Sequence, residues 1–187
     1  VFDNKVILGT RARKTRTRSF NAFSSIDYPE TAVFRDTRLV TFLRRPTNQP
    51  PVRFYESLEP AVFVLRLVPG MRADIIPLLA PHYRALVLES FGVGGLPGGE
   101  HGEMFAALRR WCESGRLAVF TTQVPHEGCD LAVYEVGRAV GELPGVLEAR
   151  DMTPEAVAVK LMWALGQTED REKAARLFET PIEYDIM

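Results

Sequence analysis

Short apolar runs alternate with amphipathic stretches from residue 61 to the end of the chain, and this alternation limits the folds that the sequence can adopt. The apolar runs are AVFVLRL (61–67), ALVLES (85–90) and LAVFTTQ (117–123), each of strand length. The stretches between and after them predict helices over 71–80, 103–115, 131–143, 154–167 and 169–179. Strands that alternate with helices of this length form right-handed βαβ units. The sequence therefore predicts an α/β unit built on a parallel sheet.

The loops at the carboxyl ends of the predicted strands are where a ligand of a parallel sheet binds, and here they are 68–70, 91–102 and 124–130. Loop 91–102 is rich in glycine and lies between a strand and a helix. A dinucleotide fingerprint that begins at Gly92 would nevertheless place Pro97 at its third small position. A structural glycine loop is therefore the better interpretation.

Histidines and cysteines predict no metal site. Neither His82 and His101 nor the two cysteines show the ligand spacing of a zinc site. A thiolate at Cys129 with His126 as its base is an alternative, but an ordinary buried cysteine is the favoured interpretation. We expect neither a metal nor another cofactor.

Composition places the chain among globular proteins. Of its 187 residues 46% are hydrophobic and 25% are charged, and the formal net charge is −1. No apolar run reaches the roughly 20 residues needed to cross a bilayer, so we expect no membrane partner. Cys112 and Cys129 are the only cysteines, which favours a reducing cytoplasm over an oxidising compartment.

The charge is unevenly distributed. Residues 1–50 hold ten Lys and Arg against four Asp and Glu, whereas residues 51–187 hold thirteen against twenty. Five cations crowd into residues 11–18: Arg11, Arg13, Lys14, Arg16 and Arg18. A solvated basic segment is the first interpretation, in which Arg11→Gln or Arg18→Gln has a mild effect. A phosphate-binding arm ranks second, because only Phe20 and Phe23 are near enough in sequence to stack on bases.

The first residues, VFDNKVILG, indicate a strand, a tight turn at Asp3-Asn4 and a second strand. A strand at the first residue needs a partner outside the sequence, so we expect a longer parent protein. A short strand pair is predicted at 32–35 and 39–43, about the turn Asp36-Thr37, in a stretch with the composition of an extended linker.

Five stretches together resemble the cytoplasmic type I branch of bacterial L-asparaginases, in the asparaginase and glutaminase family. They are GTRARKTRTRSFNAFSSIDYP (9–29), FVLRLVPGM (63–71), LVLESFGVGGLP (86–97), TTQVPHEGCDLAVYEVGRAV (121–140) and ARDMTPEAVAVKLMWALGQT (149–168). They follow the family's order and span nearly the whole chain. The set is specific, although each stretch alone is weak.

The resemblance implies a two-domain amidohydrolase with a threonine nucleophile and a threonine-aspartate pair in an N-terminal domain that precedes this sequence. It also implies an active-site lysine at the end of that domain, and Lys14 occupies that place in RARKTRTRSFNAFSS. A threonine hydroxyl needs a base, and a partly desolvated lysine among cations can serve as one. Lys14 is thus the expected catalytic residue.

The resemblance further implies three parts: residues 1–35 as the tail of the N-terminal catalytic domain, 36–60 as a linker, and 61–187 as a flavodoxin-like parallel-sheet C-terminal domain. Family members form dimers or tetramers in which loops of this domain complete the neighbouring subunit's site. The matching residues are Gly94, Gly95 and Asp130, expected to bind substrate across the interface. Many relatives carry Asn at the place of Gly95.

The expected function is hydrolysis of L-asparagine to aspartate and ammonia by a cytoplasmic homodimer or homotetramer, with no nucleic-acid partner. The chain alone is expected to be inactive, because it lacks the nucleophile. The alternative is a flavodoxin-like binding module whose basic arm docks on nucleic acid or on an acidic partner.

Overall fold

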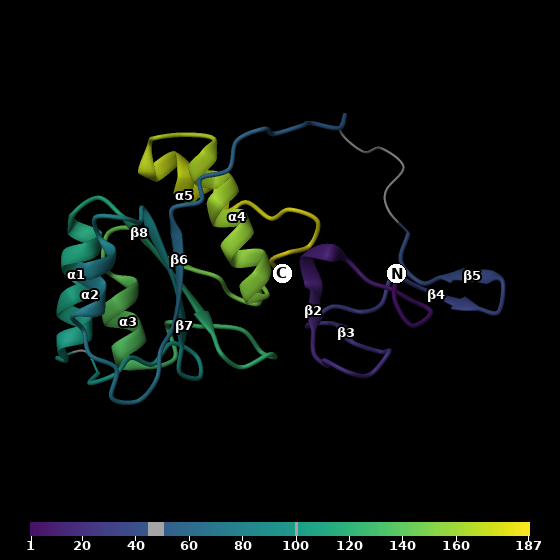
Figure 1. The fold of residues 1–187 in the computed structure, drawn as a ribbon, viewed down its shortest axis with the longest axis horizontal. Coiled ribbons are helices and arrows are strands. Elements are labelled where there is room, and N and C mark those ends of the chain that lie inside the picture. Colours follow the sequence, from purple (N-terminus) through teal and green to yellow (C-terminus); the bar gives the residue numbers. More distant parts are fainter. Residues whose placement is uncertain (45–50, 100) are drawn as a thin grey trace.

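The computed structural model describes residues 1–44, 51–99 and 101–187, and its larger part is built on a parallel sheet (Figure 1). The sheet has four strands in the order β6-β7-β8-β9, and every neighbouring pair is parallel. They are β6 (Val62–Arg66), β7 (Ala85–Ser90), β8 (Leu117–Thr122) and β9 (Val146–Glu148). The three predicted strands are confirmed, as is the parallel sheet. The fourth, β9, was not predicted, because three residues are too few to show a pattern.

Five helices cover the two faces of this sheet. They are α1 (Ile75–Leu79), α2 (Glu103–Glu113), α3 (Glu135–Gly141), α4 (Pro154–Gly166) and α5 (Arg171–Glu179). Because the strand order follows the chain, each right-handed crossover places its helix on the same face, and α1, α2 and α3 lie there together. The chain then crosses to the other face, where α4 and α5 lie (Figure 1).

Side chains of the two central strands alternate between two cores. Leu88 and Phe120 pack with the helices α1 to α3, whereas Val87 and Val119 pack with α4 and α5. Each of these four side chains is fully buried. Continuous apolar runs, rather than alternating ones, are what a parallel strand covered on both faces requires.

Two helices are shorter than predicted, and local chemistry explains both. A helix from residue 71 would place Pro77 in its interior, where it has no N–H to donate, and α1 begins only at Ile75. Before α3, the Asp130 carboxylate accepts from the Ala132 amide at 2.9 Å and forms a turn. The predicted start of α4 is confirmed, since the Thr153 hydroxyl accepts from the Ala156 amide.

The N-terminal segment forms two small antiparallel sheets. One has the order β1-β4-β5, built from β1 (Lys5–Val6), β4 (Ala32–Arg35) and β5 (Arg38–Thr41), and the other pairs β2 (Ala12–Lys14) with β3 (Phe23–Ser25). A 3₁₀ helix, η1 (Gly9–Arg11), precedes β2. The predicted turn at Asp3-Asn4 is confirmed, with φ of 48° and 60°. Figure 1 shows this segment beside the N-terminal end of α4. In the described ranges no helix is long and apolar enough to span a membrane.

Candidate active site

Two loops meet at the carboxyl edge of the parallel sheet. The Asp130 amide donates to the Val93 carbonyl at 3.0 Å, and the Cys129 Sγ lies 3.3 Å from the same oxygen. A Cβ built on Gly94 would lie 2.6 Å from Leu131 Cδ2 and 3.8 Å from Leu131 Cα, so the Leu131 side chain packs directly on Gly94. The structure thus brings the three residues expected to bind substrate, Gly94, Gly95 and Asp130, into one cluster at the edge where ligands of parallel sheets bind.

Gly95 closes the first of these loops. Its amide donates to the Phe91 carbonyl at 2.8 Å, and its carbonyl accepts from the Phe91 amide at 3.2 Å. The position holds no side-chain amide, so any polar contact from Gly95 to a substrate must come from its backbone.

Asp130 presents its carboxylate at the surface of the cluster. The side chain is exposed, and one oxygen accepts from the Ala132 amide. Below it, Glu148 accepts from the Leu131 amide at 3.2 Å. Burial raises the pKa of Glu148, and the nearby negative charge of Asp130 raises it further. Asp130 is therefore the exposed carboxylate of this edge, and its charge suits a cationic amine.

Gly128, in loop 124–130, has no room for a side chain because the backbone of Arg150 lies against it. Gly128 has φ +70°, and a Cβ there would lie 2.6 Å from the Arg150 carbonyl oxygen. Gly99 has φ +68°, and among the described residues other than its chain neighbours no atom lies within 4 Å of such a Cβ. We expect Gly128→Ala to lower the free energy of unfolding by about 1–3 kcal/mol more than Gly99→Ala. Urea unfolding of both variants measures the difference. Equal losses of unfolding free energy in the two variants would show that loop 124–130 accommodates the added methyl group without a cost in stability.

Lys14 lies at the end of β2, opposite Phe23 of β3, and its side chain is exposed. Within the described part of the chain, no hydrogen bond or ion pair joins Lys14 to Gly94, Gly95 or Asp130. The structure therefore assembles the three residues of the C-terminal domain but leaves Lys14 outside their cluster.

Arg11 is not a solvated cation, so the interpretation of residues 11–18 as a solvated basic segment is wrong for this residue. Its side chain is fully buried. Its guanidinium donates to the Tyr184 carbonyl at 2.6 Å, to the Asp151 carbonyl at 2.8 Å and to the Asp151 carboxylate at 2.9 Å. Arg11 therefore ties the segment that carries Lys14 to the start of α4 and to the C-terminal tail.

The rest of the basic run is also partly engaged within the chain. Arg13 lies 3.7 Å from the Glu155 carboxylate, and Arg16 donates to the Asn21 carbonyl. Phe20 and Phe23 both pack against Phe2, with ring centroids 5.1 and 5.2 Å away. The two aromatics that would have stacked on bases thus have a partner in the protein, although both remain exposed.

The pairing of Cys129 with His126 as nucleophile and base is not found. Cys129 is buried, and desolvation raises the pKa of its thiol to about 12. His126 Nδ1 instead lies 2.9 Å from the Asp27 carboxylate, which comes from the N-terminal segment. Cys129 is an ordinary buried cysteine, as favoured, and His126 contacts a different part of the chain.

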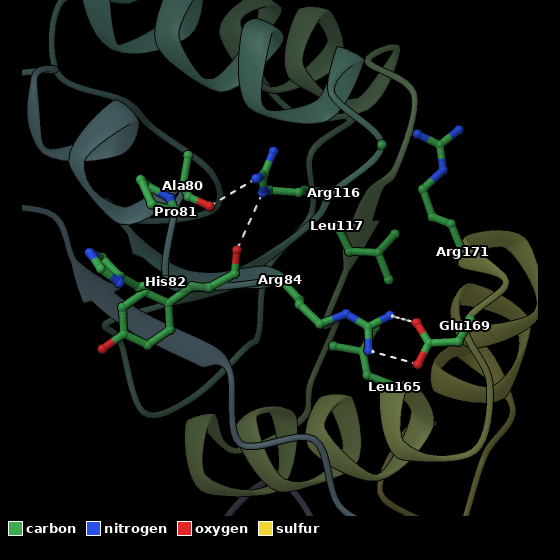
Figure 2. A pocket seen from close by; sticks show the side chains of 11 residues that line it. Ala80, Pro81, His82, Arg84, Arg116, Leu117, Leu165, Glu169 and Arg171 are labelled. Atoms are coloured by element: carbon green, nitrogen blue, oxygen red, sulfur yellow. Dashed lines mark hydrogen bonds and ion pairs between the residues drawn. The ribbon is translucent and has the colours of Figure 1, made fainter.

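A separate pocket of about 260 Å³ lies at the opposite, amino edge of the sheet. Figure 2 shows that its arginines are tied to protein oxygens: Arg84 pairs with both oxygens of Glu169, and Arg116 donates to the Ala80 carbonyl at 2.8 Å. Arg171 also lines it. No residue predicted to act in the site lies here.

Sequence reasoning missed Arg11 and Asp27 as residues that join the parts of the site. Arg11 and Asp151 are 140 positions apart, and Asp27 and His126 are 99 apart. No spacing rule connects residues at such distances. The neighbouring cations also made Arg11 look like one more member of a solvated run.

Comparison with known proteins identifies relatives over nearly the whole chain. Residues 61–178 match the family model of the glutaminase/asparaginase C-terminal domain. The chain is 39% identical over 186 residues to an L-asparaginase of Thermococcus kodakarensis, a match that covers 99% of the chain and 56% of that relative. It is 35% identical over 176 residues to a subunit of the glutamyl-tRNA(Gln) amidotransferase of Metallosphaera sedula, covering 92% of the chain and 39% of that protein.

Solved structures agree with these relatives. The thermostable L-asparaginase from Thermococcus kodakarensis superposes with a TM-score of 0.92 at 35% identity, and L-asparaginase I from Vibrio cholerae with 0.85 at 26%. Each comparison covers 100% of this chain and 56% of the other. The chain thus spans about half the length of the asparaginases that it matches. It belongs to the glutaminase/asparaginase family and comprises that family's C-terminal domain with the segment before it.

Proposed function

We propose that this chain is the C-terminal part of an L-asparagine amidohydrolase. The observation that carries the proposal is the 39% identity to an L-asparaginase, which extends over 99% of the chain and so includes the segment with Lys14. The parent would be a cytoplasmic homodimer or homotetramer that uses no metal or other cofactor and no nucleic acid. Residues 1–35 would belong to its catalytic domain, 36–60 to the linker and 61–187 to the C-terminal domain.

The proposed reaction proceeds through an acyl-enzyme. A threonine hydroxyl in the upstream part attacks the side-chain amide carbon of asparagine, and Lys14 Nζ accepts the hydroxyl proton. That proton passes to the departing nitrogen as the C–N bond breaks, and ammonia leaves. Water then attacks the ester and gives one proton, through Lys14, to the threonine oxygen as the ester bond breaks, which releases aspartate and restores the hydroxyl. Backbone N–H groups stabilise the oxyanion.

The carboxyl-edge cluster supplies the proposed contacts to the substrate. The exposed carboxylate of Asp130 has the charge to hold the α-amino group of asparagine. The backbone of Gly94 and Gly95 would line the substrate, and in the proposed assembly these loops complete the site of the neighbouring subunit. The clustering of the three residues at one edge supports this division of roles.

A second candidate follows from the second kind of relative. Several proteins with a similar sequence identity to this chain are subunits of glutamyl-tRNA(Gln) amidotransferases. They include the one from Metallosphaera sedula at 35% and one from Pyrococcus furiosus at 33%. In that case the parent would release ammonia for use by a partner subunit. The two functions share the amide hydrolysis and differ in what becomes of the ammonia.

The isolated 187-residue chain and the full-length parent test the proposal together. We expect the parent to release ammonia from L-asparagine at an unchanged rate after EDTA treatment. We expect the isolated chain to release none, because the proposed threonine nucleophile belongs to the upstream part. Coupled ammonia assays measure both. Loss of the parent's activity in EDTA, or turnover by the isolated chain, would contradict the mechanism.

A further inference from the structure

Asp27 joins the segment of Lys14 to the loop of Asp130. It lies two residues beyond β3, the strand that pairs with the strand of Lys14. Its Oδ1 lies 2.9 Å from His126 Nδ1, and its Oδ2 accepts from the Glu127 amide at 3.0 Å. One carboxylate therefore holds a side chain and a backbone N–H of loop 124–130.

Backbone strain lies on both sides of this contact. Asp27 has φ 48° and Glu127 has φ 75°, both in the left-handed region that residues other than glycine rarely adopt. Gly128 follows with φ 70°. Non-glycine residues hold such conformations where the surrounding structure over-determines them, and they gather at functional sites. The left-handed conformation of Glu127 is energetically unfavourable, and in this conformation its backbone N–H donates to Asp27.

The far end of the loop is held from the other side. The Cys129 amide donates to the Arg150 carbonyl at 2.8 Å, and the Asp130 amide to the Val93 carbonyl at 3.0 Å. The loop is thus fixed to the sheet edge at residues 129–130 and to the N-terminal segment at residues 126–127. Asp27 controls the second attachment.

We propose that Asp27 is a positioning residue, which holds loop 124–130 against the segment of Lys14 and so sets the place of Asp130 for substrate binding. The proposal rests on the function proposed above. It assigns Asp27 an effect on the binding of asparagine rather than on proton transfer, because the held loop carries the proposed substrate contact and no proton donor or acceptor of the mechanism.

A simple surface ion pair would behave differently. The His126 side chain is 61% exposed and that of Asp27 is 23% exposed, and exposed pairs contribute little to stability. If the contact is only such a pair, removing the carboxylate changes neither binding nor loop order. The hydrogen bond from the Glu127 backbone N–H separates the two cases. An asparagine at position 27 has no charge, but its side-chain oxygen can still accept that hydrogen bond.

Three variants of the full-length parent test the proposal. Asp27→Gly removes the acceptor and tolerates the positive φ. Asp27→Asn keeps an acceptor oxygen and also tolerates that φ. Asp36→Gly is the matched control for added chain entropy, since Asp36 has φ 53° in the turn between β4 and β5.

We expect Asp27→Gly to raise the KM for asparagine about tenfold, the range of a lost bond to a charged group, with kcat within about twofold of the parent. We expect the KM of Asp27→Asn to stay close to that of the parent, and Asp36→Gly to keep the parental KM. A parental KM in Asp27→Gly would overturn the proposal, as would an equal rise in Asp36→Gly.

Hydrogen exchange separates this proposal from the function on which it rests. We expect amides of residues 126–130 to exchange faster in Asp27→Gly than in Asp27→Asn or Asp36→Gly. If the parent does not hydrolyse asparagine, the proposed function fails, and this difference still decides whether Asp27 holds the loop. Unchanged exchange in Asp27→Gly would show that it does not.

Discussion

Lys14→Met in the full-length parent lowers the turnover of L-asparagine by about 10²- to 10⁴-fold, the usual contribution of a general base. Methionine keeps the bulk of the lysine stem and removes the amine that accepts the threonine proton. Because the Lys14 side chain is exposed in this part of the protein, the fold survives the change. Steady-state ammonia release, with circular dichroism to check folding, measures the effect.

Lys14→Arg distinguishes a proton acceptor from a positive charge. A guanidinium stays protonated near neutral pH, so this variant recovers little of the lost turnover. Arg18→Gln, an exposed member of the same basic run, serves as the control and retains most of the rate. Near-parental turnover in Lys14→Arg would mean that Lys14 acts only through its charge.

Arg11→Met has the largest expected effect on stability. The change deletes the three hydrogen bonds of the guanidinium and leaves the Asp151 carboxylate without its cation. Removing one partner of a buried ion pair lowers the free energy of unfolding by about 3–5 kcal/mol. The Asp151 side chain is 19% exposed and can regain some water, so we expect a loss near the lower limit, about 3 kcal/mol.

Urea unfolding of Arg11→Met and Arg18→Met measures this loss against a matched control. Both variants remove one arginine from the same run, but only Arg11 is buried. Arg18→Met stays within about 0.5 kcal/mol of the parent. Equal stabilities of the two variants would show that the anchor at Asp151 contributes nothing to holding the N-terminal segment.

The fold could be predicted from the sequence wherever local patterns carry it. Apolar runs of strand length predicted β6, β7 and β8, and Thr153 followed by Pro154 predicted the start of α4, because caps and strands depend on neighbouring residues. The strand β9 has three residues and no such pattern. The start of α3 was missed because the Asp130 carboxylate competes for the Ala132 amide.

The candidate site was predictable only where a resemblance or a loop position pointed to it. Gly94, Gly95 and Asp130 meet because carboxyl ends of adjacent parallel strands share an edge, which the strand order implies. Arg11 and Asp27 act through contacts with residues about a hundred or more positions away. Such contacts follow from how the segments dock, and no local pattern encodes them.

The most direct test of the proposed function is ammonia release from L-asparagine by the purified full-length parent, with no nucleotide, tRNA or second protein added. We expect aspartate and ammonia to form in equal amounts under these conditions, and the rate not to rise when ATP and glutamyl-tRNA are supplied. Activity that appears only with those additions and a partner subunit would contradict the assignment and favour an amidotransferase subunit instead.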